Sequence, residues 1–308
     1  MVKVHLDTDI GGDIDDLCAL ALVLAWPGAE LVGLTTNCDD GGKRAGYARF
    51  ALELAGGTDV PVAAGADVAG GYYRLPLGLP LESDYWPERV RPAPGHLGDA
   101  LALLEGSIRA GATIVAIGAY TNLALLERRT PGILRDAEVV LMGGYVFPMT
   151  TGLPEWPPEF DWNVQVDAAS AMTVFESCTP TFVPIAVTAQ TALRRRDLPA
   201  LASGGPLSRL IARQAEAFDR DERMSERYGA TCARVPEDIV NCHHDPLACA
   251  IALGWSDGVE TREVRLKAEI VDGWMRQRID PAGAPARLVT EVDGEAFNAE
   301  WLRLVSTV

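Results

Sequence analysis

Short apolar segments alternate with amphipathic segments along the first two thirds of the chain. Runs rich in valine, isoleucine and leucine, bounded by polar or glycine-rich residues, predict buried strands. They span residues 2–6, 31–36, 113–117, 139–142 and 181–187. Between them, apolar residues recur at helical spacing near 14–25, 43–56, 98–110, 121–128 and 167–177. This alternation predicts an α/β fold with an open, mostly parallel sheet and helices on both faces.

The pattern changes after Gly254, where three segments alternate between apolar and polar residues as antiparallel strands do. These segments span residues 262–270, 274–279 and 286–292, and an amphipathic segment follows at 297–305. We interpret them as a β-rich C-terminal extension of a single domain that spans residues 1–308. Two stretches rich in Gly, Pro and aromatic residues, 65–98 and 143–162, predict long loops of the kind that surround active sites.

Composition narrows the class of partner. The 308 residues include 27 Lys and Arg against 43 Asp and Glu, a net charge of −16. An acidic protein of this kind is not expected to bind nucleic acid or an anionic membrane nonspecifically. The chain shows no secretory signal and no apolar stretch long enough to span a bilayer, and its six cysteines form no CxxC pair. We therefore expect a cytoplasmic protein with reduced thiols.

Five carboxylates lie within ten residues after the first predicted strand, in the sequence DTDIGGDIDD (residues 7–16). Carboxylates crowded this closely resist joint ionisation, and a bound cation would relieve their repulsion. Oxygen ligands suit Ca²⁺ or Mg²⁺, so the segment predicts a metal site where a strand meets a helix. Alternatively, Asp15 and Asp16 only complement the positive end of a helix dipole. An EF-hand does not fit, because Gly11 and Cys18 occupy positions where that loop needs ligands.

Three further polar clusters fall where predicted strands end or helices begin. They are residues 37–40, Thr121-Asn122 and His243-His244-Asp245. Because ligands of open α/β sheets bind at the carboxyl ends of the strands, these clusters could share one site with residues 7–16. A structural role stays open, since Asp245 before Pro246 is also a standard helix start. His244, beside that carboxylate, could titrate usefully.

Taken together, five segments in this order resemble the nucleoside hydrolases, which cleave ribonucleosides at the N-glycosidic bond. The segments are DTDIGGDIDD, LVGLTTNCDD, GAYTNLAL, LMGG followed by EFDWNVQVDAASA, and HHDPLACA. The resemblance extends from residue 2 to about residue 305 and implies the open α/β sheet of that family. It also implies Ca²⁺-dependent hydrolysis of a ribonucleoside to free base and ribose, by a homodimer or homotetramer.

Carried over by position, the resemblance implies a role for each residue of the site. The Ca²⁺ ligands would be Asp9, Asp16, the backbone carbonyl of Thr121, and Asp245. Asp9 would also be the general base toward a metal-activated water. The substrate contacts would be Asp15, Asp40, Asp161 and Asn163, and His244 would lie near the leaving base.

These residue types suit glycosidic cleavage. Carboxylates stabilise the positive charge of an oxocarbenium-like transition state. A metal lowers the pKa of a bound water, and a histidine can protonate or hydrogen-bond the departing base. Asp and Asn side chains that grip the ribose hydroxyls supply orientation.

Several positions depart from the common pattern of the family. Asp40 stands where many members have Asn, Ala119 replaces a Pro, and Ala186 replaces an acidic residue. For the acidic ribose contact, Asp161 has the expected spacing, whereas Glu159 keeps a Glu-Phe pair; we favour Asp161.

Four aromatic residues could either stack on the base or simply pack the loops. They are Trp86, Trp156, Trp162 and Tyr228.

Two rival functions stay open. A haloacid-dehalogenase-like phosphatase also begins with a strand and DxD, so Asp7 would be its nucleophile and Asp9 its acid/base, with Mg²⁺. The second half of the chain carries no convincing GDxxxD-like motif, which disfavours it. The other rival is a non-catalytic nucleoside- or ribose-binding protein. The presence of every expected ligand argues against a loss of turnover.

Overall fold

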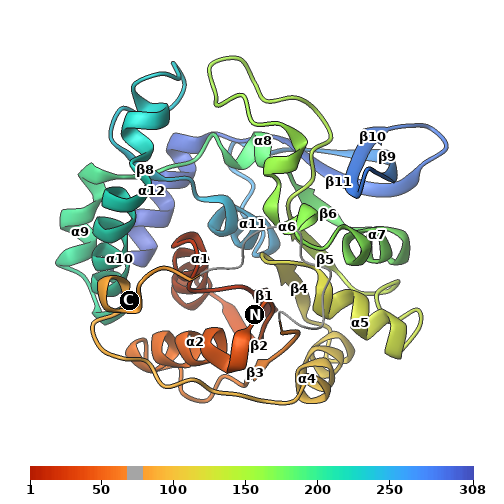
Figure 1. Cartoon of the computed structure of the whole chain (residues 1–308), viewed down its shortest axis with the longest axis horizontal. Helices are drawn as coiled ribbons and strands as arrows, with labels where there is room; N and C mark the ends of the chain where they lie inside the picture. Colours follow the sequence, from red (N-terminus) through yellow and green to blue (C-terminus); the bar gives the residue numbers. More distant parts are fainter. Residues whose placement is uncertain (68–78) are drawn as a thin grey trace.

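One mixed sheet runs through the computed structural model, which describes residues 1–67 and 79–308 (Figure 1). Within these residues it has nine strands in the order β10-β9-β11-β6-β5-β4-β1-β2-β3. The seven strands from β11 to β3 are parallel to one another, whereas β9 is antiparallel to both β11 and β10. The predicted open, mostly parallel α/β sheet is confirmed.

The five strands predicted in the first two thirds all occur. They are β1 (Val2–Thr8), β2 (Ala29–Thr36), β4 (Thr113–Ala116), β5 (Val139–Met142) and β6 (Thr181–Val183). Three short strands were not predicted: β3 (Val62–Ala64), and β7 (Leu193–Arg194) with β8 (Ile239–Asn241), which pair in a separate small sheet. The prediction of a strand over 181–187 was too long. Pro184 precedes the short helix α8 (Ile185–Thr188) and lacks the N–H that a continued strand would need.

Helices cover both faces of the sheet, as expected. Along β4 and β5, Val115 and Val140 belong to one apolar cluster and Ile114 and Val139 to another, because successive strand residues point to opposite faces. The first cluster includes α1 (Asp15–Ala25), α2 (Lys43–Leu54), α9 (Leu198–Ala202), α10 (Pro206–Glu222), α11 (His244–Ala252) and α12 (Gly294–Val305). The second includes α4 (Leu97–Arg109), α5 (Thr121–Arg129) and α7 (Ala168–Ser177). The loops add the short helices α3 (Glu82–Tyr85) and α6 (Trp162–Gln165).

The C-terminal part is strand-rich, as predicted, and it continues the main sheet. The antiparallel strands β9 (Glu260–Val271) and β10 (Trp274–Ile279) extend to one side of the molecule (Figure 1). Strand β11 (Ala284–Glu291) joins this hairpin to β6, and Leu288 lies opposite Phe182. The last helix, α12, packs back on α1, where the indole Nε1 of Trp301 donates to the carbonyl of Cys18.

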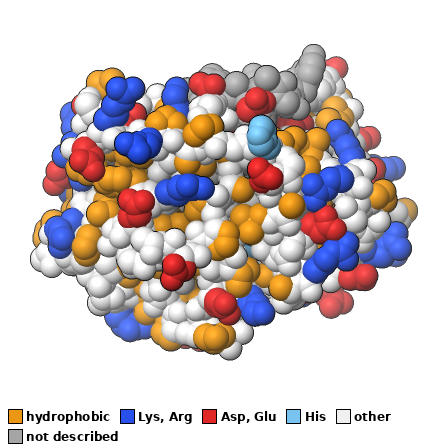
Figure 2. Space-filling view, turned by 90° about the horizontal axis from the view of Figure 1, so that it is seen from below, with side chains coloured by type: hydrophobic (Ala, Val, Ile, Leu, Met, Phe, Trp, Pro, Cys, Tyr) orange, Lys and Arg blue, Asp and Glu red, His pale blue; other side chains and the backbone are white. Residues whose placement is uncertain are grey.

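The parallel strands bring the predicted polar clusters to one edge of the sheet. The chain after β1 leads into α1, the chain after β4 leads into α5, and β8 leads into α11. Across the described residues, no helix is both long and apolar enough to cross a membrane. On the face shown in Figure 2, acidic and basic side chains are interspersed among hydrophobic ones.

Candidate active site

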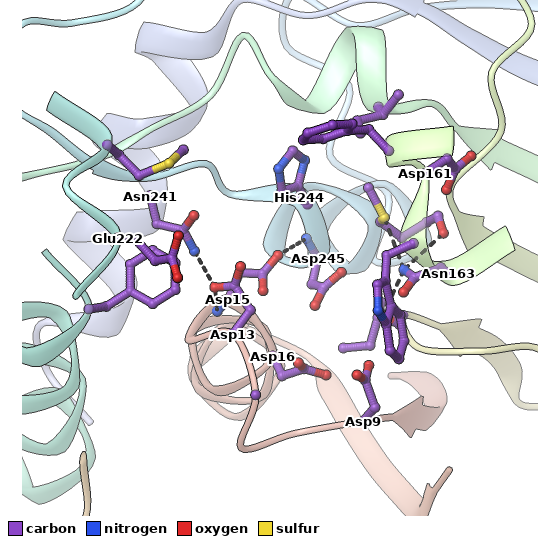
Figure 3. Close-up of a pocket in the computed structure, with 18 of the residues that line it drawn as sticks. Asp9, Asp13, Asp15, Asp16, Asp161, Asn163, Glu222, Asn241, His244 and Asp245 are labelled. Carbon is purple, nitrogen blue, oxygen red and sulfur yellow. Dashed lines mark hydrogen bonds between the residues drawn. The ribbon is translucent and has the colours of Figure 1, made fainter. Parts of the chain in front are cut away.

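A cavity of about 750 Å³ opens at this edge of the sheet (Figure 3). Seven residues predicted for the site line it: Asp9, Asp15, Asp16, Asp161, Asn163, His244 and Asp245. They come from the chain after β1, from the loop before α6 and α6 itself, and from the start of α11. The fold therefore brings together residues that lie more than 200 positions apart in the sequence.

Three carboxylates form the centre of the cavity. Asp15, Asp16 and Asp245 each place an oxygen within 4.8 Å of the others, and all three are buried. The backbone N–H of Asp245 donates to Asp15 Oδ2 over 3.3 Å, and Thr8 Oγ1 donates to Asp16 Oδ1. Helix α11 begins at His244, so Asp245 lies in its first turn rather than at the N-cap. The structural alternative for Asp245, helix capping, is therefore not what the structure shows.

The electrostatics of this cluster suit a cation. The pKa values of Asp15, Asp16 and Asp245 lie well above the ordinary value for an aspartate. Burial is the largest cause, and repulsion from the neighbouring carboxylates adds to it. Three negative charges held this closely cannot all form at low cost without a counter-ion. A hard divalent cation with oxygen ligands fits the chemistry of these donors.

Asp9 lies beside this cluster, next to an arginine. Its side chain is largely buried, and its Oδ2 lies 3.8 Å from Nη1 of Arg44. Burial raises the pKa of Asp9, and the positive charge of Arg44 opposes that shift. The ionised form of Asp9 is therefore stabilised by the positive charge of Arg44.

Asp161 and Asn163 line the opposite side of the cavity (Figure 3). Asp161 accepts a hydrogen bond from the backbone N–H of Gly144 over 2.5 Å, and burial raises its pKa to about 7. The Nδ2 of Asn163 donates to the carbonyl of Ile117 over 2.9 Å. Glu159 instead forms an ion pair with Arg276 and does not line the cavity, which favours Asp161 for the acidic contact.

His244 lies beside aromatic side chains that line the cavity. Its Nδ1 lies 2.6 Å from Thr188 Oγ1, and its ring centroid lies 6.0 Å from that of Trp156. Burial lowers the pKa of His244 to about 4, so the ring is neutral at pH 7. The Nε1 of Trp156 donates to Tyr228 Oη over 3.1 Å, and Trp162 also lines the cavity.

The fourth aromatic candidate, Trp86, packs the core instead. Its ring is buried and stacks on Tyr47 with centroids 4.3 Å apart. Part of the loop at 65–98 borders the cavity as expected, since Leu79, Pro80 and Tyr85 line it. Residues 68–78 of that loop lie outside the described residues.

Two predicted site residues are not part of the cavity lining. The Asp40 side chain is 70% exposed and pairs with Lys43 over 3.4 Å. Thr121 is buried, and its Oγ1 donates to Asp167 Oδ2 over 2.8 Å. Asp40 begins the short 3-10 turn η1 (Asp40–Gly42), and its side chain faces solvent there. Thr121 begins α5, and its side chain faces Asp167 at the N-cap of α7.

Asp7 does not fit the role of a phosphatase nucleophile. Its carboxylate is fully buried and accepts hydrogen bonds from Thr35 Oγ1, Asn37 Nδ2 and Asn122 Nδ2. It does not line the cavity, so a substrate in the cavity cannot reach it. Burial raises its pKa to about 6, and the three donors oppose that shift.

The cavity also includes charged or polar residues that the sequence patterns did not identify. They are Arg44, Glu222, Arg227 and Asn241, with Asp13 from the acidic segment. The helical spacing of Arg44 with Ala48 and Ala51 indicates that it lies on the buried face of α2, but it does not indicate the contact with Asp9. Asn241 donates from Nδ2 to Asp13 Oδ1 over 2.5 Å, a contact that no local pattern could reveal.

Comparison with known proteins gives one consistent result. A family model described as inosine-uridine preferring nucleoside hydrolase matches residues 4–299. The pyrimidine-specific ribonucleoside hydrolase RihA of Citrobacter koseri is 29% identical over 270 residues, which cover 82% of this chain and 78% of that protein.

Solved structures agree on the fold. A plant nucleoside hydrolase has a TM-score of 0.78 at 19% identity, over 100% of this chain and 99% of that chain. A purine-preferring ribonucleoside hydrolase from Gardnerella vaginalis has a TM-score of 0.78 at 20% identity, over 99% and 98%.

Proposed function

This chain belongs to the inosine-uridine preferring nucleoside hydrolase family and is therefore a hydrolase of N-glycosyl compounds. We propose that it hydrolyses ribonucleosides to free base and ribose in a Ca²⁺-dependent reaction, with Asp9 as general base. The observation that carries this proposal is the buried cluster of Asp15, Asp16 and Asp245 inside a cavity that Asp9, Asn163 and His244 also line.

The cation would be held by Asp16 and Asp245 together with Asp9, and the resemblance adds the backbone carbonyl of Thr121. Bound there, Ca²⁺ would offset the repulsion among the carboxylates and lower the pKa of a water molecule. Asp15 would remain free to accept a hydrogen bond from a ribose hydroxyl, because Asp15 and Asp16 diverge by about 100° at the start of α1.

Asp9 would take the proton of the attacking water. Its carboxylate is largely buried at the edge of the cluster, and the charge of Arg44 favours its ionised form. A general base has to be deprotonated and within reach of the water that it activates. The surrounding carboxylates would also stabilise positive charge that develops on the sugar ring.

Asp161 and Asn163 would orient the ribose from the other side. The amide of Asn163 is fixed by its bond to Ile117, so its position is set before the substrate arrives. Buried partners of this kind predict a strong preference for ribose, since a missing hydroxyl would leave them unsatisfied.

His244 would assist the departing base through a hydrogen bond. Because burial keeps the ring neutral at pH 7, His244 would act as a neutral N–H donor rather than as an imidazolium. Thr188, at 2.6 Å from Nδ1, would fix the orientation of the ring. Trp156 and Tyr228 would form the wall beside the base.

The direct test is ribose release from inosine, uridine, adenosine, guanosine, cytidine and an aryl riboside, before and after chelation and after Ca²⁺ is restored. We expect release that chelation abolishes and Ca²⁺ restores, with 2′-deoxynucleosides much slower. Ribose binding without release from any of these substrates would support the non-catalytic rival. Hydrolysis of a phosphate monoester, with no action on nucleosides, would support the phosphatase.

We also propose that the enzyme works as a homo-oligomer in the cytoplasm. The family resemblance supports the oligomer, and five buried cysteine thiols fit a reducing compartment: Cys18, Cys38, Cys178, Cys242 and Cys249. Analytical ultracentrifugation would identify a dimer or tetramer, and a monomer at micromolar concentration would contradict the first part.

A further inference from the structure

Arg44 is a buried cation in a cavity lined mostly by carboxylates. It lies in the first turn of α2, lines the cavity beside Asp9 and Gly12, and is only 2% exposed. Burying a guanidinium is costly unless other groups compensate its charge and its N–H donors, so the partners of Arg44 indicate what this residue does.

The loops after β1 and β2 hold the side chain in place. Its Nε donates to the carbonyl of Cys38 over 3.0 Å, and its Nη1 donates to the carbonyl of Ile10 over 3.3 Å. The backbone is fixed as well, because Asp39 Oδ1 accepts from the N–H of Arg44 over 2.9 Å. Gly42, with a φ of 78°, makes the turn that starts the helix over this carboxylate.

Arg44 and Asp9 lie close enough together for one hydroxyl to contact both. Nη1 and the carboxylate oxygen are 3.8 Å apart, which is an ion pair but too long for a hydrogen bond. A hydroxyl oxygen to one side of this pair, at hydrogen-bond distance from both atoms, could accept from the guanidinium and donate its own proton to Asp9. Gly12 has no side chain, so the guanidinium stays uncovered on that side. A Cβ at this position would lie 3.6 Å from Nη1, in van der Waals contact with it.

A sugar in this cavity needs a donor of this kind. Each ribose hydroxyl both donates and accepts, whereas ionised carboxylates only accept. Three other side chains of the lining that carry N–H donors already donate to protein groups. Asn163 donates to Ile117, Asn241 donates to Asp13, and Arg227 donates to Glu222 and Tyr228.

We propose that Arg44 is a specificity-determining residue that donates a hydrogen bond to one hydroxyl of the substrate sugar, beside Asp9. This inference rests on the proposed function and deepens it. Arg44 takes the role predicted for Asp40, which lies four residues earlier and points to solvent. The contact to the sugar from this part of the chain is therefore a donor and not an acceptor.

The test combines substitutions of Arg44 with substrates that each lack one sugar hydroxyl. Arg44→Met and Arg44→Lys are compared with the wild type on its best ribonucleoside substrate and on the 2′-, 3′- and 5′-deoxy forms of that substrate. Lys43→Met is the matched control, because Lys43 is the neighbouring helix residue and its side chain is half exposed.

We expect Arg44→Met to lower kcat/KM for the ribonucleoside about 10- to 100-fold, the loss of one hydrogen bond from a charged donor. The substitution also removes the charge that favours ionised Asp9, and that loss is common to all four substrates. For the one analogue that lacks the contacted hydroxyl, the total loss should therefore be at least about three-fold smaller than for the ribonucleoside. Arg44→Lys should lie between wild type and Arg44→Met, and Lys43→Met should stay within about two-fold of wild type.

Equal losses for all four substrates in both Arg44 variants would overturn the proposal, since they would indicate a general effect on the site. Should Arg44→Met fail to fold, Arg44→Lys carries the same comparison, and its Ca²⁺ affinity shows whether the metal site is intact. A wild type that releases ribose from no nucleoside would instead overturn the proposed function itself.

Discussion

The polar segments after β1 and after β2 look alike in the sequence but differ in the structure. Both follow a buried parallel strand and both contain several carboxylates. After β1, the carboxylates of Asp9, Asp15 and Asp16 line the cavity. After β2, Asp39 accepts from the backbone at the start of α2, and Asp40 points to solvent. Strand order thus predicts where a polar segment lies, and local hydrogen bonding decides whether it faces the ligand.

The largest effect should come from the segment after β1. We expect Asp9→Ala to lower kcat by at least about 10³-fold, because both the base and a ligand are lost. The measurement is steady-state ribose release at saturating substrate and Ca²⁺, with circular dichroism to verify the fold. Near-normal turnover in the variant would contradict the role of Asp9.

His244 should show a smaller effect that depends on the leaving group. We expect His244→Ala to slow natural nucleosides about 10²-fold and an activated aryl riboside only a few-fold. The aryl group leaves without assistance, so the substrate itself is the control. Equal losses on both would argue that His244 positions the site rather than assists the base.

The acidic cluster should also make stability depend on pH and on Ca²⁺. In the folded state the pKa values of Asp15, Asp16 and Asp245 are raised, so folded protein keeps protons that unfolded protein releases above about pH 4. The stability of the Ca²⁺-free protein should therefore fall as pH rises through this range. Asp161, with a pKa of about 7, extends the fall to neutral pH.

Calcium binds the ionised carboxylates, so it should raise Tm more at pH 8 than at pH 5. Thermal denaturation with and without Ca²⁺ at these two pH values measures the difference. An equal increase at both pH values would indicate that the ion binds somewhere other than this cluster.

The segment after β2 should mainly affect stability. We expect Asp39→Ala to lower the free energy of unfolding by about 1–2 kcal/mol, because the backbone N–H groups of Arg44 and Ala45 lose their acceptor. Asp40→Asn is the matched control and should change both stability and kcat/KM little. A large loss of activity in Asp40→Asn would restore Asp40 as a substrate contact.

Much of the fold follows from the sequence because buried parallel strands are continuous apolar runs. Strand β5 matches its prediction at both ends, whereas β3 has only three residues and gives too short a pattern. Helix α10 was not predicted, although Leu207, Leu210, Ile211 and Phe218 have helical spacing. The helical spacing of these apolar residues was visible in the sequence, although many charged residues lie between them.

The site was predictable to the extent that its residues follow strand ends. Asp16 and Asp245 meet in one cluster as expected, because β1 and β8 lead directly into the helices that carry them. Arg44 was missed, since its contact with Asp9 depends on the turn at Gly41 and Gly42. Glu222 comes from the end of α10, whose approach to the cavity no local pattern indicates.

The central claim is that the segment after β1 and the start of α11 form one Ca²⁺-dependent centre for ribonucleoside hydrolysis. The most direct measurement is a Ca²⁺ titration of chelated protein that follows heat and ribose release in the same samples, for wild type, Asp245→Asn and Asp40→Asn. We predict one Ca²⁺ per chain with activity returning in proportion for wild type and Asp40→Asn, and neither for Asp245→Asn. Full activity after chelation, or unchanged Ca²⁺ binding by Asp245→Asn, would contradict the account.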